Sequence, residues 1–252
     1  MEARIRERLA ALEIEHGFRI VYANESGSRA WGFASADSDY DIRFVFVWPR
    51  DRYLDVALPP ETVELGVDED LLDISGWDLR KALRLFRKSN ASVTEWLYSP
   101  IVYHEERNLI DRWRSLTRKV FAPKTSAAHY SGLGKNMFGT IKAAEKTTAK
   151  TYLYALRAVL AARFVLEQSR PAPVAFEELL KEVELDLALR EEIEVMVRQK
   201  AVGAEADDIV RSERLDRFIT EALDEAARVD NLESRVAGAD ELDQLFRSAI
   251  EV

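Results

Sequence analysis

The chain contains no cysteine, and proline and glycine are sparse, at 7 and 10 of its 252 residues. Without cysteine it can form neither a disulfide nor a thiolate metal site, which agrees with a reducing compartment. No apolar run approaches the ~18 residues that a membrane-spanning helix needs. The first residues, MEARIRERLAALEIEHG, lack the apolar core of a signal peptide. These absences predict a cytoplasmic protein with no membrane segment, and the length of 252 residues indicates one large or two small domains.

Acidic residues outnumber basic ones, 45 to 36, but the middle of the chain is basic. The net charge is −9, which by itself argues against nucleic acid. Residues 107–170 nevertheless carry 13 Lys and Arg against 3 Asp and Glu, whereas residues 1–106 and 171–252 are both acidic. This basic middle segment either contacts a polyanion such as RNA or is an unevenly charged, solvated surface.

Apolar strand-like runs crowd into the first third of the chain, and helical periodicity dominates after it. From Trp77 onwards, apolar residues recur every three or four positions. This order is typical of the α+β class, with a small mixed sheet followed by an all-helical part. We expect a catalytic domain at 1–106 and a helical domain at 107–252, which ends in acidic helices. The predicted strands cover residues 18–24, 41–48, 61–67 and 70–75, and the predicted helices 2–15, 77–88, 92–97, 107–120, 126–146, 151–168, 175–184, 187–201, 212–229 and 239–250.

The central motif is a Gly27-Ser28 turn followed, after ten residues, by Asp39-Tyr40-Asp41 at the start of a strand. Because side chains two apart leave the same face of a strand, the two carboxylates lie together, with Cα atoms roughly 7 Å apart. Carboxylates placed in this way converge on hard cations. Gly27 permits close backbone approach, and Ser28 supplies a hydroxyl. Together these groups favour a site that handles phosphate.

Two further residues extend this motif. Arg43 falls on the face of Asp39 and Asp41, where it can pair with an anion or hold a carboxylate. Asp73 stands in the apolar run LLDIS, and a lone aspartate in such a strand requires a partner. We therefore expect Asp73 to be the third carboxylate of the site, with Asp70 as the weaker alternative because it lies nearer the turn.

These residues carry a resemblance to a known family. Gly27-Ser28, SDYD and the later Asp73 resemble the nucleotidyltransferase fold of the DNA polymerase beta superfamily. The segments GSRAWGFASADSDYDIR and DISGWDLRKALRLFRKSNASVTEWLYSPIVY are similar, more narrowly, to a polymerase-beta-like family linked with RNA repair (RlaP). KTYLYALRAVLAARFV and MVRQKAVGAE resemble its helical part, so the similarity covers roughly residues 18–220.

The resemblance implies transfer of a nucleoside monophosphate from an NTP to a hydroxyl group, with release of pyrophosphate. It implies two Mg²⁺ ions, with Mn²⁺ as a substitute, bound by Asp39 and Asp41, and Asp73 joining the ion near the nucleophile. Gly27 and Ser28 would hold the triphosphate. Arg29 and Arg43 match the family pattern beside the acids, and we assign them to nucleotide binding.

A second set of candidates lies in the basic middle segment. Lys150, Tyr154 and Arg157 fall in a family-like segment and share one face with Lys146 if a helix runs through Thr147-Thr148. That face either contacts the phosphates and bases of an NTP or RNA, or is simply a solvated helix face. Other residues of family-like segments have open roles, namely Lys81, Asn90, Lys200 and Glu205.

Three functions remain open at this stage. The leading one is a magnesium-dependent nucleotidyltransferase acting on RNA through the basic segment, at a damaged or cleaved end. The second keeps the chemistry but transfers the nucleotide to a small molecule or a protein hydroxyl. The third is a non-catalytic module that binds NTP or RNA, and the complete Asp39, Asp41 and Asp73 set argues against it. The sequence does not specify the NTP, the acceptor or the oligomeric state.

Overall fold

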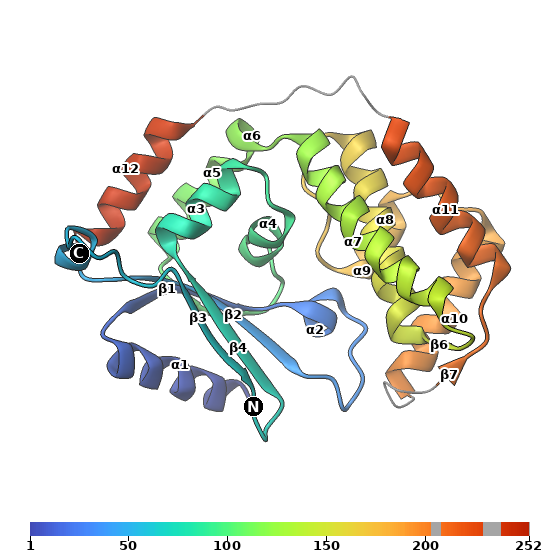
Figure 1. Ribbon diagram of the computed structural model, residues 1–252, viewed down its shortest axis with the longest axis horizontal. Helices are drawn as coiled ribbons and strands as arrows, with labels where there is room; N and C mark the ends of the chain where they lie inside the picture. The colour runs from blue at the N-terminus through green and yellow to red at the C-terminus, as the bar shows by residue number, and fades with distance from the viewer. Residues whose placement is uncertain (203–207, 229–237, 252) are drawn as a thin grey trace. The chain divides into compact units, whose positions relative to one another are not determined.

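The computed structural model of the protein describes residues 1–202, 208–228 and 238–251 (Figure 1). The chain forms two compact units, each assembled from separate segments. The first comprises residues 1–30, 39–121 and 235–252, and the second comprises 31–38 and 122–234. In the described part of the chain, no helix has the length and apolar character that crossing a bilayer requires.

The first unit is built on a five-stranded sheet with the order β3-β4-β2-β1-β5. β2 and β4 are parallel, and the other neighbouring pairs are antiparallel, so the sheet is mixed as predicted. Four strands match the predicted ones to within a few residues. The short fifth strand was not predicted, because four residues, VYHE, carry too little alternation. The bounds are β1 Arg19–Glu25, β2 Tyr40–Val47, β3 Thr62–Val67, β4 Leu72–Asp78 and β5 Val102–Glu105.

Helices cover both faces of this sheet (Figure 1). Ile42, Phe44 and Phe46 of β2 pack with α1 (Glu2–His16) on one face. Val45 and Val47 point to the other face, where they pack with the remaining helices of the unit. This alternation is the period-2 pattern of a strand buried on both sides. The helices of the second face are α3 Leu79–Arg87, α4 Ala91–Leu97, α5 Arg107–Ser115, α6 Thr117–Val120 and α12 Ala239–Ile250.

The C-terminal helix α12 belongs to this first unit, although the sequence suggested a helical domain running from 107 to 252. Leu242, Leu245 and Ala249 bury their side chains in the same apolar cluster as α3 and α5. The single helix expected over 107–120 is also divided, because α5 ends at Ser115 and α6 starts at Thr117. The compact units therefore differ from the expected boundary at 106/107.

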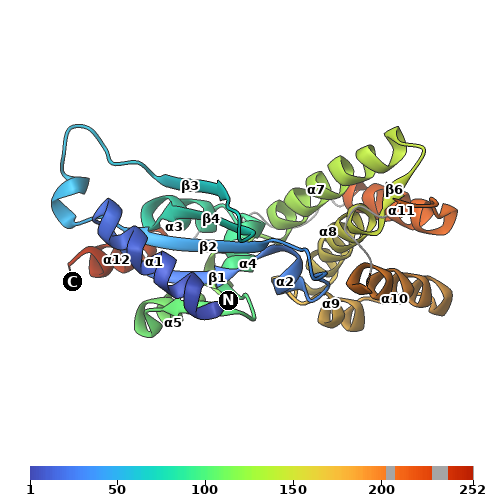
Figure 2. The same cartoon turned by 90° about the horizontal axis from the view of Figure 1, so that it is seen from below.

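The second unit is helical, with α8 at its centre. α8 buries 13 of its 20 residues and contacts α7, α9, α10 and α11, with α7 on one side and α9 and α10 on the other (Figure 2). Gly134 of α7 allows this close packing, because an added Cβ would lie 2.9 Å from a methyl group of Val159. The bounds are α7 Pro123–Ala143, α8 Ala149–Gln168, α9 Phe176–Glu182, α10 Leu187–Val202 and α11 Glu213–Arg228, with a two-stranded pair β6 Thr147–Thr148 and β7 Asp208–Ile209.

Candidate active site

Asp41 and Asp73 lie side by side on the parallel strands β2 and β4, where they are register partners. Arg43, two residues along β2, donates from Nη2 to Asp41 Oδ1 at 2.9 Å and to Asp73 Oδ2 at 2.7 Å. The Asp41 and Asp73 side chains keep 24% and 28% of their surface exposed. The predicted partner of the lone Asp73 is therefore Arg43, which offsets the repulsion between two adjacent carboxylates that solvent can reach.

Asp39 lies one residue before β2, not within it. Its backbone carbonyl accepts a hydrogen bond from Arg29 Nε at 3.1 Å. The Arg29 guanidinium also stacks on the ring of Tyr40, 3.6 Å from its centroid. Arg29 therefore holds the backbone at the start of β2, and thereby helps to position the Asp39 carboxylate.

Gly27 opens the short helix α2 (Gly27–Trp31) directly against Asp41. Its φ is +57°, and a Cβ built on it would lie 1.9 Å from Asp41 Oδ2. The residue before Gly27 is fixed to the same strand, because the Ser26 amide donates to the Asp41 carbonyl at 2.8 Å. Ser28 follows as a buried residue. Only glycine fits at position 27, both for its conformation and for its contact, so the Gly-Ser turn and the carboxylates form one local structure.

Glu25 supports Asp41 from within the core, and the sequence did not single it out. Its fully buried side chain accepts the Asp41 amide at 2.6 Å and the hydroxyl of Tyr103 on β5. Burial raises the pKa of the Glu25 carboxyl, whereas these two hydrogen bonds act in the opposite direction. A glutamate that closes the strand RIVYANE, directly after its apolar stretch and Asn24, was the available signal. Tyr103 could not be found because β5 itself was not predicted.

The donor set at this end of the sheet suits a hard divalent cation, since Asp41 and Asp73 offer adjacent carboxylate oxygens. No three acidic or histidine side chains in the described ranges gather closely enough to hold a metal ion. Asp39 thus does not form such a group with Asp41 and Asp73. The residues are therefore of the right chemical type, while their gathering around an ion remains a prediction.

The helical candidates do not form one continuous stripe. Thr147 and Thr148 form the strand β6, which pairs with β7, and Thr148 caps α8 by accepting the Thr151 amide at 3.1 Å. The condition for a single stripe, a helix that runs through these two threonines, is therefore not met, because their backbone is extended. Lys146 precedes the break and Lys150 follows it, so helical spacing does not relate the two residues.

Two of the helical candidates pack inside the second unit. Arg157 is only 3% exposed; it donates to the Val174 carbonyl at 3.2 Å and lies 4.3 Å from the ring centroid of Trp31. Tyr154 packs edge-on against the same ring at 4.8 Å. Lys150, at the start of α8, is half-buried. The Tyr154 ring and the Arg157 guanidinium group thus have packing roles. Nucleotide binding by Lys150, Tyr154 and Arg157 stays a prediction.

The structure gives local roles to three of the remaining candidates. Lys81 Nζ donates to Thr62 Oγ1 at 2.6 Å, and Asn90 caps α4 by accepting the Val93 amide at 3.2 Å. The buried Lys200 donates to Ser38 Oγ at 3.3 Å, within the second unit. The fourth candidate, Glu205, lies outside the described residues.

The basic segment 107–170 is divided between the two units, since α5 and α6 belong to the first and α7 and α8 to the second. Some of its cations also have acidic partners: Arg114 pairs with Glu105 at 2.8 Å and Lys119 with Glu241 at 3.0 Å. RNA binding by this segment stays a prediction.

Comparison with known proteins identifies the chain's relatives. The RlaP family, described as the RNA repair pathway DNA polymerase beta family, matches residues 1–248. The chain belongs to this family. The sequence is 37% identical over 254 residues to the uncharacterized protein YcgL of Bacillus subtilis strain 168, covering 100% of this chain and 97% of that protein. The crystal structure of a nucleotidyltransferase-like protein from Exiguobacterium sibiricum covers 97% of this chain and 75% of its own, at 12% identity and a TM-score of 0.30, which is too low to support an argument.

Membership of the RlaP family agrees with the resemblance that the motifs carry. It indicates a polymerase-beta-like nucleotidyltransferase, in keeping with the α+β architecture and with the Gly-Ser turn beside a pair of strand carboxylates.

Proposed function

We propose that this RlaP-family protein transfers a nucleoside monophosphate from an NTP to a hydroxyl group of RNA and releases pyrophosphate. The observation that supports it most directly is the pair Asp41 and Asp73, adjacent in register and bridged by Arg43. The family description, with its reference to RNA repair, supports RNA as the acceptor. The catalytic carboxylates in this proposal are those of Asp39, Asp41 and Asp73.

In the proposed reaction, the acceptor oxygen attacks the α-phosphorus of the NTP and forms a new P–O bond. The bond between the α-phosphorus and the bridging oxygen breaks, pyrophosphate leaves, and the hydroxyl proton passes to solvent. Such a reaction requires positioning and charge stabilisation more than covalent chemistry by the protein. The Glu25 contact fixes Asp41, and Arg43 aligns Asp41 with Asp73. The close contact with Gly27 brings the Gly-Ser turn, the proposed triphosphate contact, to the same carboxylate.

The proposed cofactors are two Mg²⁺ ions held by Asp39, Asp41 and Asp73, with Mn²⁺ as a substitute. When bound, these ions would supply the positive charge that stabilises the transferring phosphoryl group and the leaving pyrophosphate. Arg43 pairs with both Asp41 and Asp73. Metal binding therefore requires that oxygen lone pairs of these carboxylates stay available beside the guanidinium group. Each carboxylate has about four such acceptor positions, so one guanidinium does not saturate the pair.

The test is a transfer assay with the purified chain. Each of the four NTPs, labelled at the α-phosphate, is incubated with Mg²⁺ and either RNA, a protein extract or a panel of small hydroxyl compounds. We expect label in the RNA fraction, stoichiometric pyrophosphate release, and loss of both on chelation of the metal. Label in protein or small molecules instead would replace RNA as the acceptor. NTP binding with no labelled product in any fraction would contradict an enzymatic function.

A further inference from the structure

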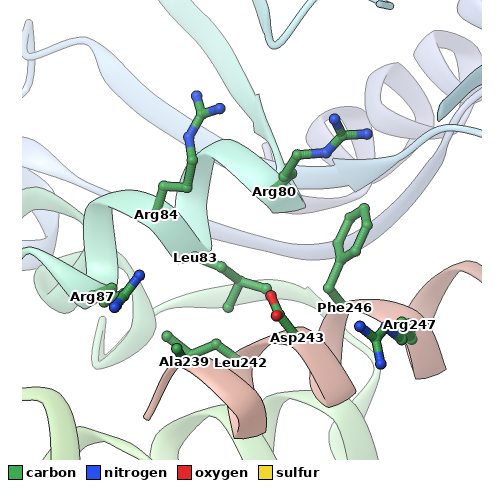
Figure 3. A pocket seen from close by; sticks show the side chains of 9 residues that line it. All are labelled: Arg80, Leu83, Arg84, Arg87, Ala239, Leu242, Asp243, Phe246 and Arg247. Atoms are coloured by element: carbon green, nitrogen blue, oxygen red, sulfur yellow. The ribbon is translucent and has the colours of Figure 1, made fainter. Parts of the chain in front are cut away.

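A pocket lined by arginines lies between α3 and α12 of the first unit (Figure 3). Its volume is about 390 Å³. Three of its arginines come from α3 and the fourth from α12, and one carboxylate and one phenyl ring also line it. These six residues, called the arginine pocket below, are Arg80, Arg84, Arg87, Asp243, Phe246 and Arg247.

The fold presents these side chains by burying the opposite faces of both helices. The α3 arginines follow one another at four and three positions, so they share a helix face, whereas Leu79 and Phe86 are buried in the core. Leu245 of α12 is buried in the same cluster. Figure 3 shows the four guanidinium groups spread around the pocket rather than converging on one point. The two helices are therefore held together by their apolar faces, which leaves a charged rim.

Two of the four arginines of the pocket make no ion pair with the described residues. Arg84 pairs with Glu61 at 2.7 Å on the surface, and Arg80 stacks on the rings of Tyr53 and Phe246, at 4.6 and 5.4 Å. Arg87 and Arg247 are exposed, and neither makes an ion pair with any residue of ranges 1–202, 208–228 and 238–251. These two guanidinium groups are thus available to an external anion.

A chain of phosphates suits this geometry better than a single anion. Guanidinium groups bind phosphate oxygens through paired N–H donors, and groups spread over two helices can each meet a different phosphate. The ring of Phe246 is already covered by Arg80 and packs against Tyr53, so the phosphates rather than the bases are the groups that this pocket can hold. We propose that the arginine pocket binds the phosphodiester backbone of single-stranded RNA. This inference rests on the proposed function, in which RNA is the acceptor.

The arginine pocket and the Asp73 carboxylate are separated by the length of β4, because Asp73 lies near the start of β4 and α3 follows the end of β4. The strand ends at Asp78. Five residues of extended chain span ~17 Å, which corresponds to ~5 nucleotides of a stacked strand at 3.4 Å each. The pocket would therefore hold RNA several nucleotides from the reacting end, and a very short RNA would not reach it.

The test measures RNA binding directly, without NTP. The probe is a fluorescent single-stranded RNA of about 12 nucleotides, titrated with the whole chain at several salt concentrations. The variant Arg87→Gln/Arg247→Gln removes the two guanidinium groups without ion pairs. The matched control, Arg6→Gln/Arg8→Gln, removes the same charge from the exposed face of α1, which packs on the opposite side of the sheet. Circular dichroism and thermal unfolding verify that both variants fold.

We expect the pocket variant to bind RNA about tenfold more weakly near 0.15 M salt, because two phosphate contacts are lost. The slope of log K against log salt should fall in magnitude by about 1.4, and the control should match wild type. A probe of about 3 nucleotides should bind wild type much more weakly than the longer probe does, because it cannot occupy the pocket and the carboxylate site together. Unchanged affinity for the longer RNA, or an equal loss in the control, would overturn the proposal.

Two additional measurements separate this inference from related ones. Inorganic phosphate is titrated against wild type and the pocket variant; if the variant loses phosphate affinity but binds RNA normally, the pocket is a small-anion site and the proposal fails. Because binding is measured without transfer, absence of nucleotidyltransfer would contradict the proposed function while leaving the RNA result intact. If transfer occurs, the pocket variant should show a raised KM for RNA and an unchanged kcat.

Discussion

Three of the strand residues predicted to act together are assembled in the structure, without Asp39, whereas the helical residues predicted to act together are not. At the start of β2 and β4, Asp41, Arg43 and Asp73 contact one another. In the helical unit, Lys146 and Lys150 are separated by an extended segment, and Arg157 is buried. The strand group depends only on the alternation of side chains along a strand, whereas the helical group required an uninterrupted helix.

The two groups differ in the length of chain that must keep one regular conformation. Side chains two apart on one strand share a face whatever surrounds them, and the neighbouring parallel strand adds Asp73 at the same level. A helical stripe over eleven residues depends on every intervening residue being helical, and Thr147 and Thr148, both β-branched, adopt an extended conformation instead. Patterns over short distances are therefore safer evidence for a site than long helical ones.

The strongest test of this comparison removes one carboxylate of the strand constellation. Asp41→Asn and Asp73→Asn should each lower kcat/KM for nucleotidyltransfer by ~10³-fold, since ~4 kcal/mol of charge stabilisation would be lost. Their melting temperatures should stay near that of wild type, because both side chains are partly exposed. The control is Asp70→Asn, at a similarly half-buried aspartate that pairs with Arg4. Activity within about tenfold of wild type in both variants would break the comparison.

The second test asks whether the Gly-Ser turn must touch Asp41. Gly27→Ala should lower kcat/KM by ~10²-fold, because the new methyl group would displace the carboxylate, as small misplacements of reacting groups do. Gly17→Ala is a matched control: Gly17 also has a positive φ, of +73°, but an added Cβ would meet nothing within 4 Å. Both variants share the backbone strain, of about 1 kcal/mol. Steady-state kinetics and thermal unfolding of both variants separate the effect of the Asp41 contact from that of backbone strain. An equal loss of activity in Gly27→Ala and Gly17→Ala would contradict a role for the contact.

The sequence predicted those features of the fold and of the site that depend on neighbouring residues, and it missed those that depend on distant ones. The first four strands, the Gly-Ser turn and the acids on one face came from local patterns, as did the central helix α8. Glu25 and Tyr103 were missed because their contact joins β1 to a strand too short to predict. The arginine pocket was missed for another reason. The acidic average of residues 1–106 concealed the basic α3, and nothing local indicates that α12 packs beside it.

The third test concerns the helical side of the comparison. Arg157→Ala should lower the free energy of unfolding by about 3 kcal/mol, because it removes a buried hydrogen bond and the packing against Trp31. Arg163→Ala, on the same helix, removes a surface guanidinium that pairs with Glu167, and should cost less than about 1 kcal/mol. Urea unfolding of both variants provides the measurement. If Arg157→Ala instead unfolds like wild type but raises KM for NTP, the nucleotide-binding prediction for Arg157 gains support over a packing role.

The smallest expected effect separates two aspartates on the same strand, β4. Asp78, at its end, is buried, accepts the Arg80 amide at 2.8 Å as the cap of α3, and accepts the Tyr53 hydroxyl. Burial raises the pKa of its carboxyl, against the lowering effect of these hydrogen bonds. The folded state therefore binds this proton more tightly than the unfolded state, so the stability that Asp78 contributes is fully present below its unfolded pKa and is lost as pH rises through the raised value.

Asp78→Asn retains a good helix cap but does not titrate. The melting temperature of Asp78→Asn relative to wild type should therefore increase as pH rises from about 4 towards neutrality. Thermal unfolding of both proteins across this range measures the difference, and a relative melting temperature that falls with pH would show that ionised Asp78 is favoured instead. Transfer activity of this variant should stay near wild type, because Asp78 lies at the opposite end of β4 from Asp73. Asp73 and Asp78 on one strand would then differ in role by position, with the partly exposed Asp73 contributing to the site and the buried Asp78 to the stability of the fold.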